Sequence, residues 1–159
     1  MGTLPKHGRV DVLVDAPVDA VWALVTDVTR TGEWSHETTG AVWLDGATHA
    51  VAGARFKGTN EKGRTKWRRT CEVLACEPHE FRFRTVPSRL YNDSTEWTFT
   101  ITAEGDKTRI EQKFEVLKIG PVLDRLFYAL IPAHRDRSAA LRQDLERLGA
   151  AAAKAAVRP

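Results

Sequence analysis

The sequence has no apolar run long enough to span a bilayer, and its N-terminal region lacks the hydrophobic stretch of a signal peptide. We therefore expect a cytoplasmic protein without integral membrane association. Charge of one sign is also lacking, because 24 Lys and Arg residues accompany 21 Asp and Glu residues and leave a formal net charge of +3. The charges are scattered, so we expect no nucleic-acid partner. The one basic cluster, TKWRR at 65–69, is typical of a solvated strand face.

Cysteine is scarce, with only Cys71 and Cys76 in the chain. Their odd spacing within or just past one predicted strand sends the two side chains to opposite faces, which disfavours a local disulfide. No metal-ligand spacing surrounds them. We therefore predict two reduced thiols, no metal site and no cofactor.

Familiar catalytic motifs are also missing. The chain has no nucleophile elbow, no phosphate-binding glycine loop and no HExxH sequence. Asp93 and Glu96 have opposite parity along the chain and cannot act together across one site. The catalytic residues are therefore unknown from the sequence, and whether the protein is an enzyme stays open.

The longest segment with helical periodicity, 120–149, predicts one long C-terminal helix. Pro121 suits its first turn and Gly149 its end. Pro132 cannot donate a backbone hydrogen bond, so the helix should bend or break near 129–132. The apolar stripe consists of Leu123, Phe127, Leu130, Leu141, Leu145 and Leu148.

Period-two alternation predicts the strands. A first strand at 9–15 precedes a helix that Pro17 opens and that continues to about Val28. Turn signals such as Asp45-Gly46 separate the later strands. These are predicted at 40–45, 56–60, 65–75, 81–85, 95–101 and 110–116.

Strands followed by one long helix indicate an α+β fold, in which the helix covers the dry face of an antiparallel sheet. The length of 159 residues fits a single domain over 1–159. We place its core at 9–148 and expect frayed tails at 1–8 and 150–159.

Short motifs accompany this order of elements: Ala16-Pro17-Val18, Val21-Trp22, Asp27 with Trp34, and Gly53 with Phe56. Together with the closing kinked helix, they make 9–148 resemble the polyketide cyclase/dehydrase and START-related lipid-transfer superfamily (SRPBCC). The resemblance implies a helix-grip fold, in which a curved seven-stranded antiparallel sheet wraps around a long kinked C-terminal helix. Two short helices follow the first strand, and a cavity lies between sheet and helix.

Members of this superfamily mostly bind hydrophobic small molecules, and a subset cyclises poly-keto chains. The resemblance therefore implies binding or transport of a lipid, polyketide or quinone-like molecule in an internal cavity. One alternative is a polyketide cyclase/aromatase-type enzyme, a dehydrase-like lyase, acting in the same cavity. Another is a non-catalytic regulatory or toxin-like interaction protein. The glycine-rich loop of the plant allergen branch is reduced here to Gly46 and Gly53, so the activities proposed for that branch do not carry over.

Polar residues interrupt the inward faces of the predicted elements. Arg69 and Gln112 each share a strand face with apolar neighbours. Stepping along the helix stripe from its first half leads to His134 and then to Arg137 or Ser138. A cavity that holds water or the polar end of a ligand would explain these residues, and so would a satisfied internal network or a place at the edge of the stripe.

The inward guanidinium of Arg69 would suit a carboxylate, an enolate or a carbonyl, and His134 nearby could act as general acid and base. We predict that Arg69, Gln112 and His134 line the polar end of a greasy pocket. Several aromatic residues are added because the resemblance implies a cavity, and Asn60 is added on the condition that Phe56 faces the helix. The predicted pocket is Asn60, Trp67, Arg69, Phe83, Trp97, Gln112, Phe127 and His134.

Overall fold

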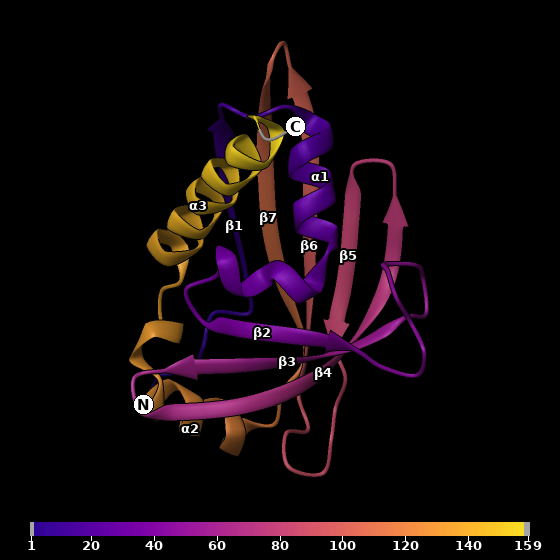
Figure 1. The fold of residues 1–159 in the computed structure, drawn as a ribbon. Helices are drawn as coiled ribbons and strands as arrows, with labels where there is room; N and C mark the ends of the chain where they lie inside the picture. The colour runs from indigo at the N-terminus through magenta and orange to yellow at the C-terminus, as the bar shows by residue number, and fades with distance from the viewer. Residues whose placement is uncertain (1, 158–159) are drawn as a thin grey trace.

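The computed structural model describes residues 2–157, which form one seven-stranded antiparallel sheet with helices packed against it (Figure 1). The strand order along the sheet is β1-β7-β6-β5-β4-β3-β2, so β2 to β7 form a meander and β1 joins it beside β7. Helix α3 packs on β1 and on α1. The α+β helix-grip fold that the resemblance implies is confirmed.

The strands are β1 (His7–Val14), β2 (Thr38–Trp43), β3 (Arg55–Lys62), β4 (Thr65–Glu77), β5 (Glu80–Thr85), β6 (Ser94–Glu104) and β7 (Lys107–Lys118). The helices are α1 (Val18–Thr26), α2 (Pro121–Leu130) and α3 (Ser138–Val157), with 3-10 turns η1 (Val28–Glu33) and η2 (Pro132–His134). The pair α1 and η1 supplies the two short helices expected after the first strand. Among residues 2–157, no helix is long and apolar enough to cross a membrane.

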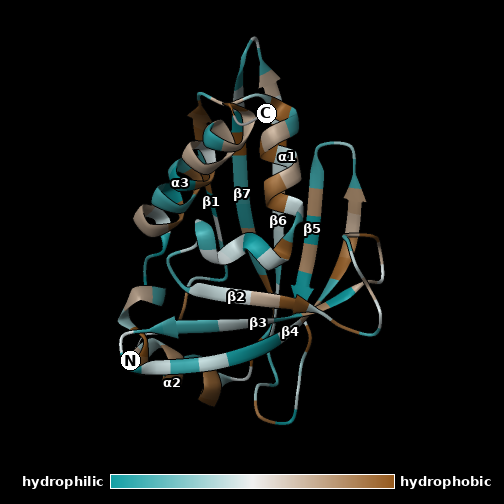
Figure 2. Cartoon of the chain, in the orientation of Figure 1, coloured by the Kyte–Doolittle hydropathy of each residue, from teal (hydrophilic) through white to brown (hydrophobic). Residues whose placement is uncertain are grey.

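The predicted strand alternation is present in the sheet, and Figure 2 shows polar and apolar bands alternating along β4 and β5. On β4, Arg69, Cys71, Val73 and Ala75 are buried, while the residues between them are partly exposed. Residues two apart therefore share a face, as the pleat of a strand requires. This inward face borders the space between sheet and helices.

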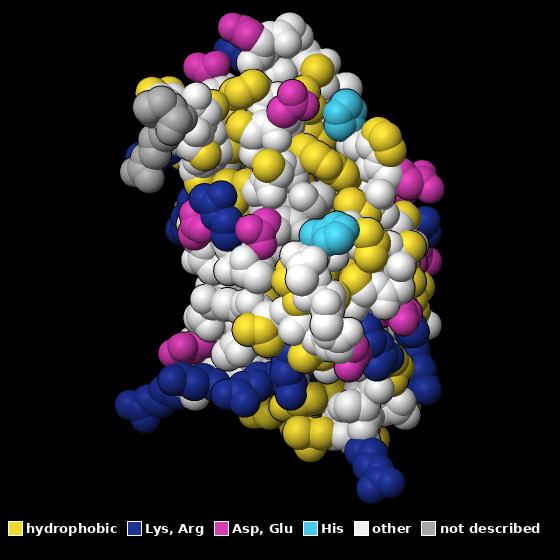
Figure 3. Space-filling model, turned by 45° about the vertical axis from the view of Figure 1, so that its right-hand side comes forward, with side chains coloured by type: hydrophobic (Ala, Val, Ile, Leu, Met, Phe, Trp, Pro, Cys, Tyr) yellow, Lys and Arg dark blue, Asp and Glu magenta, His cyan; other side chains and the backbone are white. Residues whose placement is uncertain are grey.

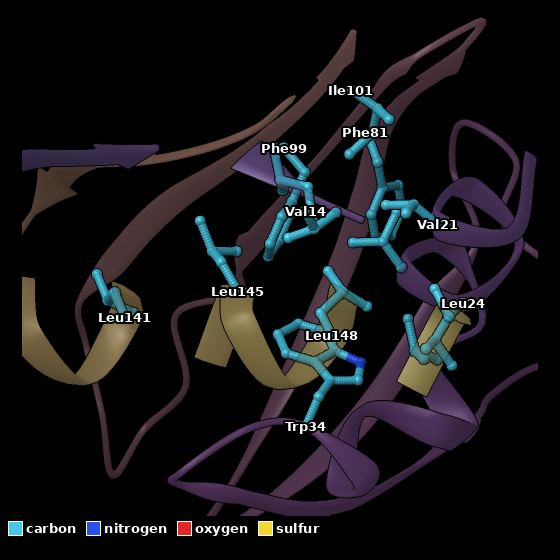
Figure 4. Packing of buried hydrophobic residues seen from close by; sticks show 14 of the residues in the cluster. Val14, Val21, Leu24, Trp34, Phe81, Phe99, Ile101, Leu141, Leu145 and Leu148 are labelled. Atoms are coloured by element: carbon cyan, nitrogen blue, oxygen red, sulfur yellow. The ribbon is translucent and has the colours of Figure 1, made fainter. Parts of the chain in front are cut away.

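The core lies between the sheet, α1 and α3 (Figure 4). Helix α3 inserts Leu145 and Leu148, which are fully buried, against Val14 of β1 and residues of α1. Burial of each such side chain contributes roughly 1.5–3 kcal/mol. The C-terminal half of the predicted stripe is thus a true core stripe.

The long kinked helix expected for this segment is interrupted, because the segment forms two helices, α2 and α3, with η2 between them. Pro132 has no amide hydrogen to donate, and it disfavours helical backbone in the residue before it. Accordingly, Ile131 leaves the helical region with φ −124° and ψ 78°. The expected break near 129–132 is therefore confirmed.

The apolar stripe predicted for the first half of the helix faces inward only in part, through Phe127, which lines the cavity between sheet and helices. Leu130 is 63% exposed, whereas the one buried residue of α2 is Asp124. The Asp124 carboxylate accepts the backbone N–H of Leu4 at 2.8 Å and pairs with Lys6. These bonds decide which side of α2 turns inward, and they also hold part of the N-terminal segment that was expected to fray.

Gly149 does not end the helix, since α3 continues to Val157 and Ala152 is fully buried. The core therefore passes the predicted boundary at 148, while residues 1, 158 and 159 of the predicted tails lie outside the described residues. Gly149 marks a close approach of helix and sheet. A Cβ atom at this position would lie 2.5 Å from the Cβ of Val14.

We predict that Gly149→Ala lowers the free energy of unfolding by roughly 1–3 kcal/mol, the cost of overpacking a well-packed core. Helix propensity alone predicts that the free energy of unfolding rises, because Ala is favoured over Gly inside a helix by about 1 kcal/mol. Urea denaturation of wild type and variant measures the difference. The control Ala150→Gly, at an exposed neighbour on α3, should lose about 1 kcal/mol from propensity alone. A Gly149→Ala protein more stable than wild type would contradict the close approach.

Candidate functional site

A cavity of about 240 Å³ lies between the sheet and the segments η1, α2, η2 and α3. This volume is just below the range of roughly 300–1,000 Å³ usual for small-molecule pockets. Its wall includes many aromatic rings, such as those of Phe81, Phe99 and Phe114. All eight residues predicted for the pocket lie on this wall, and their part in ligand binding stays a prediction.

Arg69 points inward as its strand face predicts, but its charge is already compensated. Its guanidinium donates to both carboxylate oxygens of Asp93, at 2.9 and 3.1 Å, and to the backbone carbonyl of Asp93 at 3.0 Å. It also lies 5.4 Å from the ring centre of Tyr91. Both members of the ion pair are buried. Arg69 is therefore a structural cation of the cavity wall rather than a free one.

Arg137 is the cavity cation that lacks such a partner. Its guanidinium lies over the rings of Trp97 and Phe114, 5.5 and 5.7 Å from their centres. Within residues 2–157 its side chain makes no hydrogen bond and no ion pair. Burial lowers the pKa of Arg137, against the opposing effect of the Glu37 and Asp93 carboxylates. Arginine stays charged at neutral pH even so, and an anion beside it would be stabilised.

His134 and Glu37 form a buried pair at the cavity wall, in which Nε2 of His134 contacts Oε1 of Glu37. Burial raises the pKa of Glu37, but the hydrogen bond and the charge of His134, with Arg137 and His36 nearby, bring it below its usual value. Glu37 is therefore ionised at neutral pH. In the tautomer in which Nε2 of His134 carries the proton and donates to Glu37, Nδ1 has a free lone pair.

A second histidine-carboxylate pair lies next to the first. His36 donates its backbone N–H to Oδ1 of Asp144 at 2.8 Å, and its Nδ1 lies 2.6 Å from Oδ2. Asp144 belongs to α3 and is only 3% exposed. Adjacent residues before β2 thus connect to two different C-terminal segments, η2 and α3.

Three buried polar atoms of the cavity wall have no hydrogen-bond partner within residues 2–157. They are Nε1 of Trp34, Oε1 of Gln112 and Nδ1 of His134. An unpaired buried donor or acceptor costs roughly 1–3 kcal/mol, so each atom favours a partner that enters the cavity. Together they offer one donor, one acceptor and one imidazole nitrogen.

Both cysteines are free. Burial raises the pKa of Cys71 to about 12, in spite of the opposing charge of Arg69, and it also raises the pKa of Cys76. Neither thiol therefore has the reactivity of a nucleophilic cysteine. No cluster of His, Cys, Asp or Glu within residues 2–157 is arranged to hold a metal ion.

Sequence reasoning missed several residues that shape the cavity electrostatically. Glu37, His36 and Asp144 gave no signal, because their partners lie about a hundred residues away in the chain. Asp93 was considered only as a partner of Glu96. In the structure Asp93 pairs with Arg69, whereas Glu96 pairs with Arg82 at a separate surface.

The fold and the cavity define a helix-grip protein. A family model described as "Polyketide cyclase / dehydrase and lipid transport" matches residues 6–153, so the chain belongs to that family. No curated protein matches the chain.

Solved structures share the fold at low sequence identity. The structure of TTHA0849 from Thermus thermophilus has a TM-score of 0.71 and 18% identity, and the alignment covers 96% of this chain and 99% of that one. NE0264 from Nitrosomonas europaea has a TM-score of 0.67 and 11% identity over 96% and 97% of the two chains. The di-domain ARO/CYC StfQ from the steffimycin biosynthetic pathway has a TM-score of 0.66 and 16% identity over 95% of this chain and 46% of StfQ.

We predict that Arg69→Leu lowers the free energy of unfolding by roughly 3–5 kcal/mol, because it leaves the Asp93 carboxylate buried without its cation. Chemical denaturation measures the loss. The control Arg82→Leu removes a partly exposed cation that lies 3.5 Å from Glu96, and it should cost less than about 1 kcal/mol. Equal losses in the two variants would show that the buried pair is not a major source of stability.

A second prediction concerns acid stability. Because the folded-state pKa of Glu37 lies below its usual value of 4.5, its ionisation stabilises the fold above that pH, and this stability is lost as the pH falls through the folded-state pKa. Glu37→Gln should therefore reduce the free energy of unfolding more at about pH 5 than at about pH 3. Urea titrations at both pH values test this. The free energy of unfolding of the control Glu146→Gln, at an exposed site on α3, should differ from that of wild type by a similar small amount at both pH values. A loss in Glu37→Gln that does not depend on pH would contradict the lowered pKa of Glu37.

Proposed function

We propose that this protein binds a hydrophobic small molecule, of lipid, polyketide or quinone-like character, in the internal cavity. The observation that carries the proposal is the combination of an aromatic wall with unpartnered polar atoms in one cavity. Membership of a family described by polyketide cyclisation, dehydration and lipid transport supports it.

The ligand lies with its apolar part along the aromatic wall and its polar end near Gln112, His134 and Arg137. Gln112 and Phe114 are two residues apart on β7 and both line the cavity, so they share its inward face. Arg137 lies over Phe114, and His134 is one turn before Arg137 in the chain. A carbonyl or an anionic oxygen at this position would accept a hydrogen bond from the Arg137 guanidinium, whereas Oε1 of Gln112 and the lone pair on Nδ1 of His134 are acceptors that a hydroxyl group of the ligand would satisfy.

Arg137 replaces Arg69 as the principal ligand cation in this proposal. The Arg69 guanidinium already donates three hydrogen bonds to Asp93. Its charge is therefore compensated by an intramolecular carboxylate, which weakens the attraction that it can offer to an anionic ligand oxygen. Arg137 has no such partner within residues 2–157, so its interaction with a ligand is not offset by the loss of an existing ion pair.

A second candidate function, a cyclase or dehydrase reaction in the same cavity, is favoured by the His134–Glu37 pair. Nδ1 of His134 would take a proton from a carbon next to a ligand carbonyl, and Arg137 would stabilise the enolate oxygen. Attack of the enolate carbon on a second carbonyl forms a carbon-carbon bond, and the proton returns from Nδ1 to the resulting alkoxide. Glu37 stabilises the protonated imidazole between the two transfers.

Matched ligands test the role of Arg137. We expect Arg137→Leu to weaken decanoate binding by roughly 1.5–3 kcal/mol, the scale of a hydrogen bond to a charged group, and to change 1-decanol binding little. Isothermal titration calorimetry measures both affinities. The control Arg82→Leu, which removes a cation outside the cavity, should leave both unchanged. Equal weakening of acid and alcohol would exclude a charge-specific role for Arg137.

A wider test covers the function itself. Native mass spectrometry of the purified protein, with a thermal-shift screen of decanoate, menadione and aromatic polyketides, should reveal a bound or stabilising ligand. A chain that carries nothing and is stabilised by none of these would reject the binding proposal and favour the interaction-protein alternative. Turnover of a poly-keto thioester that His134→Gln abolishes, with binding retained, would support the enzyme instead of the carrier.

A further inference from the structure

Helix α2 has apolar residues on its outward side as well as toward the cavity, whereas an ordinary surface helix has one apolar stripe that faces the core and a polar side that faces water. Its outward side carries Val122, Leu126 and Leu130, which are 81%, 47% and 63% exposed. Their spacing of four residues places them in one row along the helix. The charged residue Asp124 points inward and is buried instead.

Two further exposed leucines lie in the chain segments that adjoin α2. Leu117 is near the end of β7, four residues before α2 begins. Leu90 lies in the loop 86–93, which contacts α2 through the rings of Tyr91 and Phe127, 6.0 Å apart. We call the five residues Leu90, Leu117, Val122, Leu126 and Leu130 the α2 surface. Gathered apolar side chains of this kind typically mark an interaction site.

The charges around the α2 surface are of one sign. Segments 86–93 and 116–131 expose Arg89, Lys118 and Arg125. Their two acidic residues, Asp93 and Asp124, are buried in ion pairs and present no free negative charge. Figure 3 shows hydrophobic side chains with Lys and Arg beside them at the lower end of the molecule, where α2 and the 86–93 loop lie in Figure 1.

We propose that the α2 surface docks on an anionic lipid bilayer. A row of aliphatic side chains bordered by cations is the chemistry that an interfacial helix uses, with the apolar row in the acyl boundary and the cations among acidic headgroups. The same cations disfavour a second copy of this chain as occupant, because two positive surfaces would repel each other.

The docked helix borders the cavity. Phe127, on the opposite side of α2, and Ile131, directly after it, both line the cavity wall. An apolar molecule that passes between bilayer and cavity would therefore cross α2 without crossing the polar outer face of the sheet. This surface is an addition to the proposed ligand binding, and it stands whether or not the bound molecule is a lipid.

Vesicle co-sedimentation of the full chain tests the proposal. We expect binding to phosphatidylcholine vesicles that contain about 30% phosphatidylglycerol, little binding to phosphatidylcholine alone, and weaker binding as NaCl is raised. Each of Arg89→Gln, Lys118→Gln and Arg125→Gln should reduce the partition coefficient roughly fivefold. The double variant Leu126→Glu with Leu130→Glu should remove binding.

The control is Val42→Glu, which adds one of the two negative charges at an aliphatic residue of edge strand β2 that is 59% exposed. It should bind vesicles like wild type. Thermal melting of every variant verifies folding, since all the changed side chains are exposed. Absence of binding to anionic vesicles would overturn the proposal. So would binding that survives the double variant, or sedimentation equilibrium that reveals a dimer dissociated by that variant in place of vesicle binding.

Discussion

Two adjacent residues, His36 and Glu37, hold the C-terminal part of the chain over the sheet. His36 bonds Asp144 of α3, and Glu37 bonds His134 of η2. All four side chains have little exposure, so each charge depends on its partner for compensation. The His36–Asp144 and Glu37–His134 bonds start from neighbouring residues and end in different segments. Together they therefore fix the distance of η2 and α3 from the strands. The cavity exists in the space that this separation leaves.

Charge compensation gives two arginines of the same wall different chemistry. Arg69 is bound by Asp93, a residue just before β6, and the pair compensates its charge. Arg137 lies on aromatic rings, which attract a cation without neutralising it. Position in the cavity is therefore a poor guide to ligand contact unless the intramolecular partners are known. The same reasoning applies to His134, where the bond of Nε2 to Glu37 determines that Nδ1 is the nitrogen left free.

The fold does not determine the chemistry, since proteins of one architecture have unrelated functions. The solved structures at 11–18% identity establish the architecture of this chain and nothing of its ligand. The features of this chain that bear on function are local. They are an imidazole nitrogen without a partner and a cation in the wall of an aromatic cavity, and a helix beside that cavity with a row of apolar residues turned outward. Both features lie in the segment after Pro121, where the long helix of the prediction is broken.

The sequence by itself determined the strands and the inward direction of Arg69 and Gln112, because side-chain direction in a strand follows from periodicity two, a local property. The helix-grip architecture followed from the resemblance of the sequence to a known superfamily. The sequence also determined the break at Pro132, a consequence of one missing amide hydrogen. Only the tertiary structure decided which charged residues pair with one another. Asp93, Glu37 and Asp144 meet their counterparts from distant parts of the chain, and no local pattern encodes that pairing. It likewise decided that α2 turns Asp124 inward and that Gly149 continues a helix. A row of leucines shows that one face of a helix is apolar. Which face is covered depends on tertiary contacts, such as those of Asp124 with Lys6 and of Gly149 with Val14.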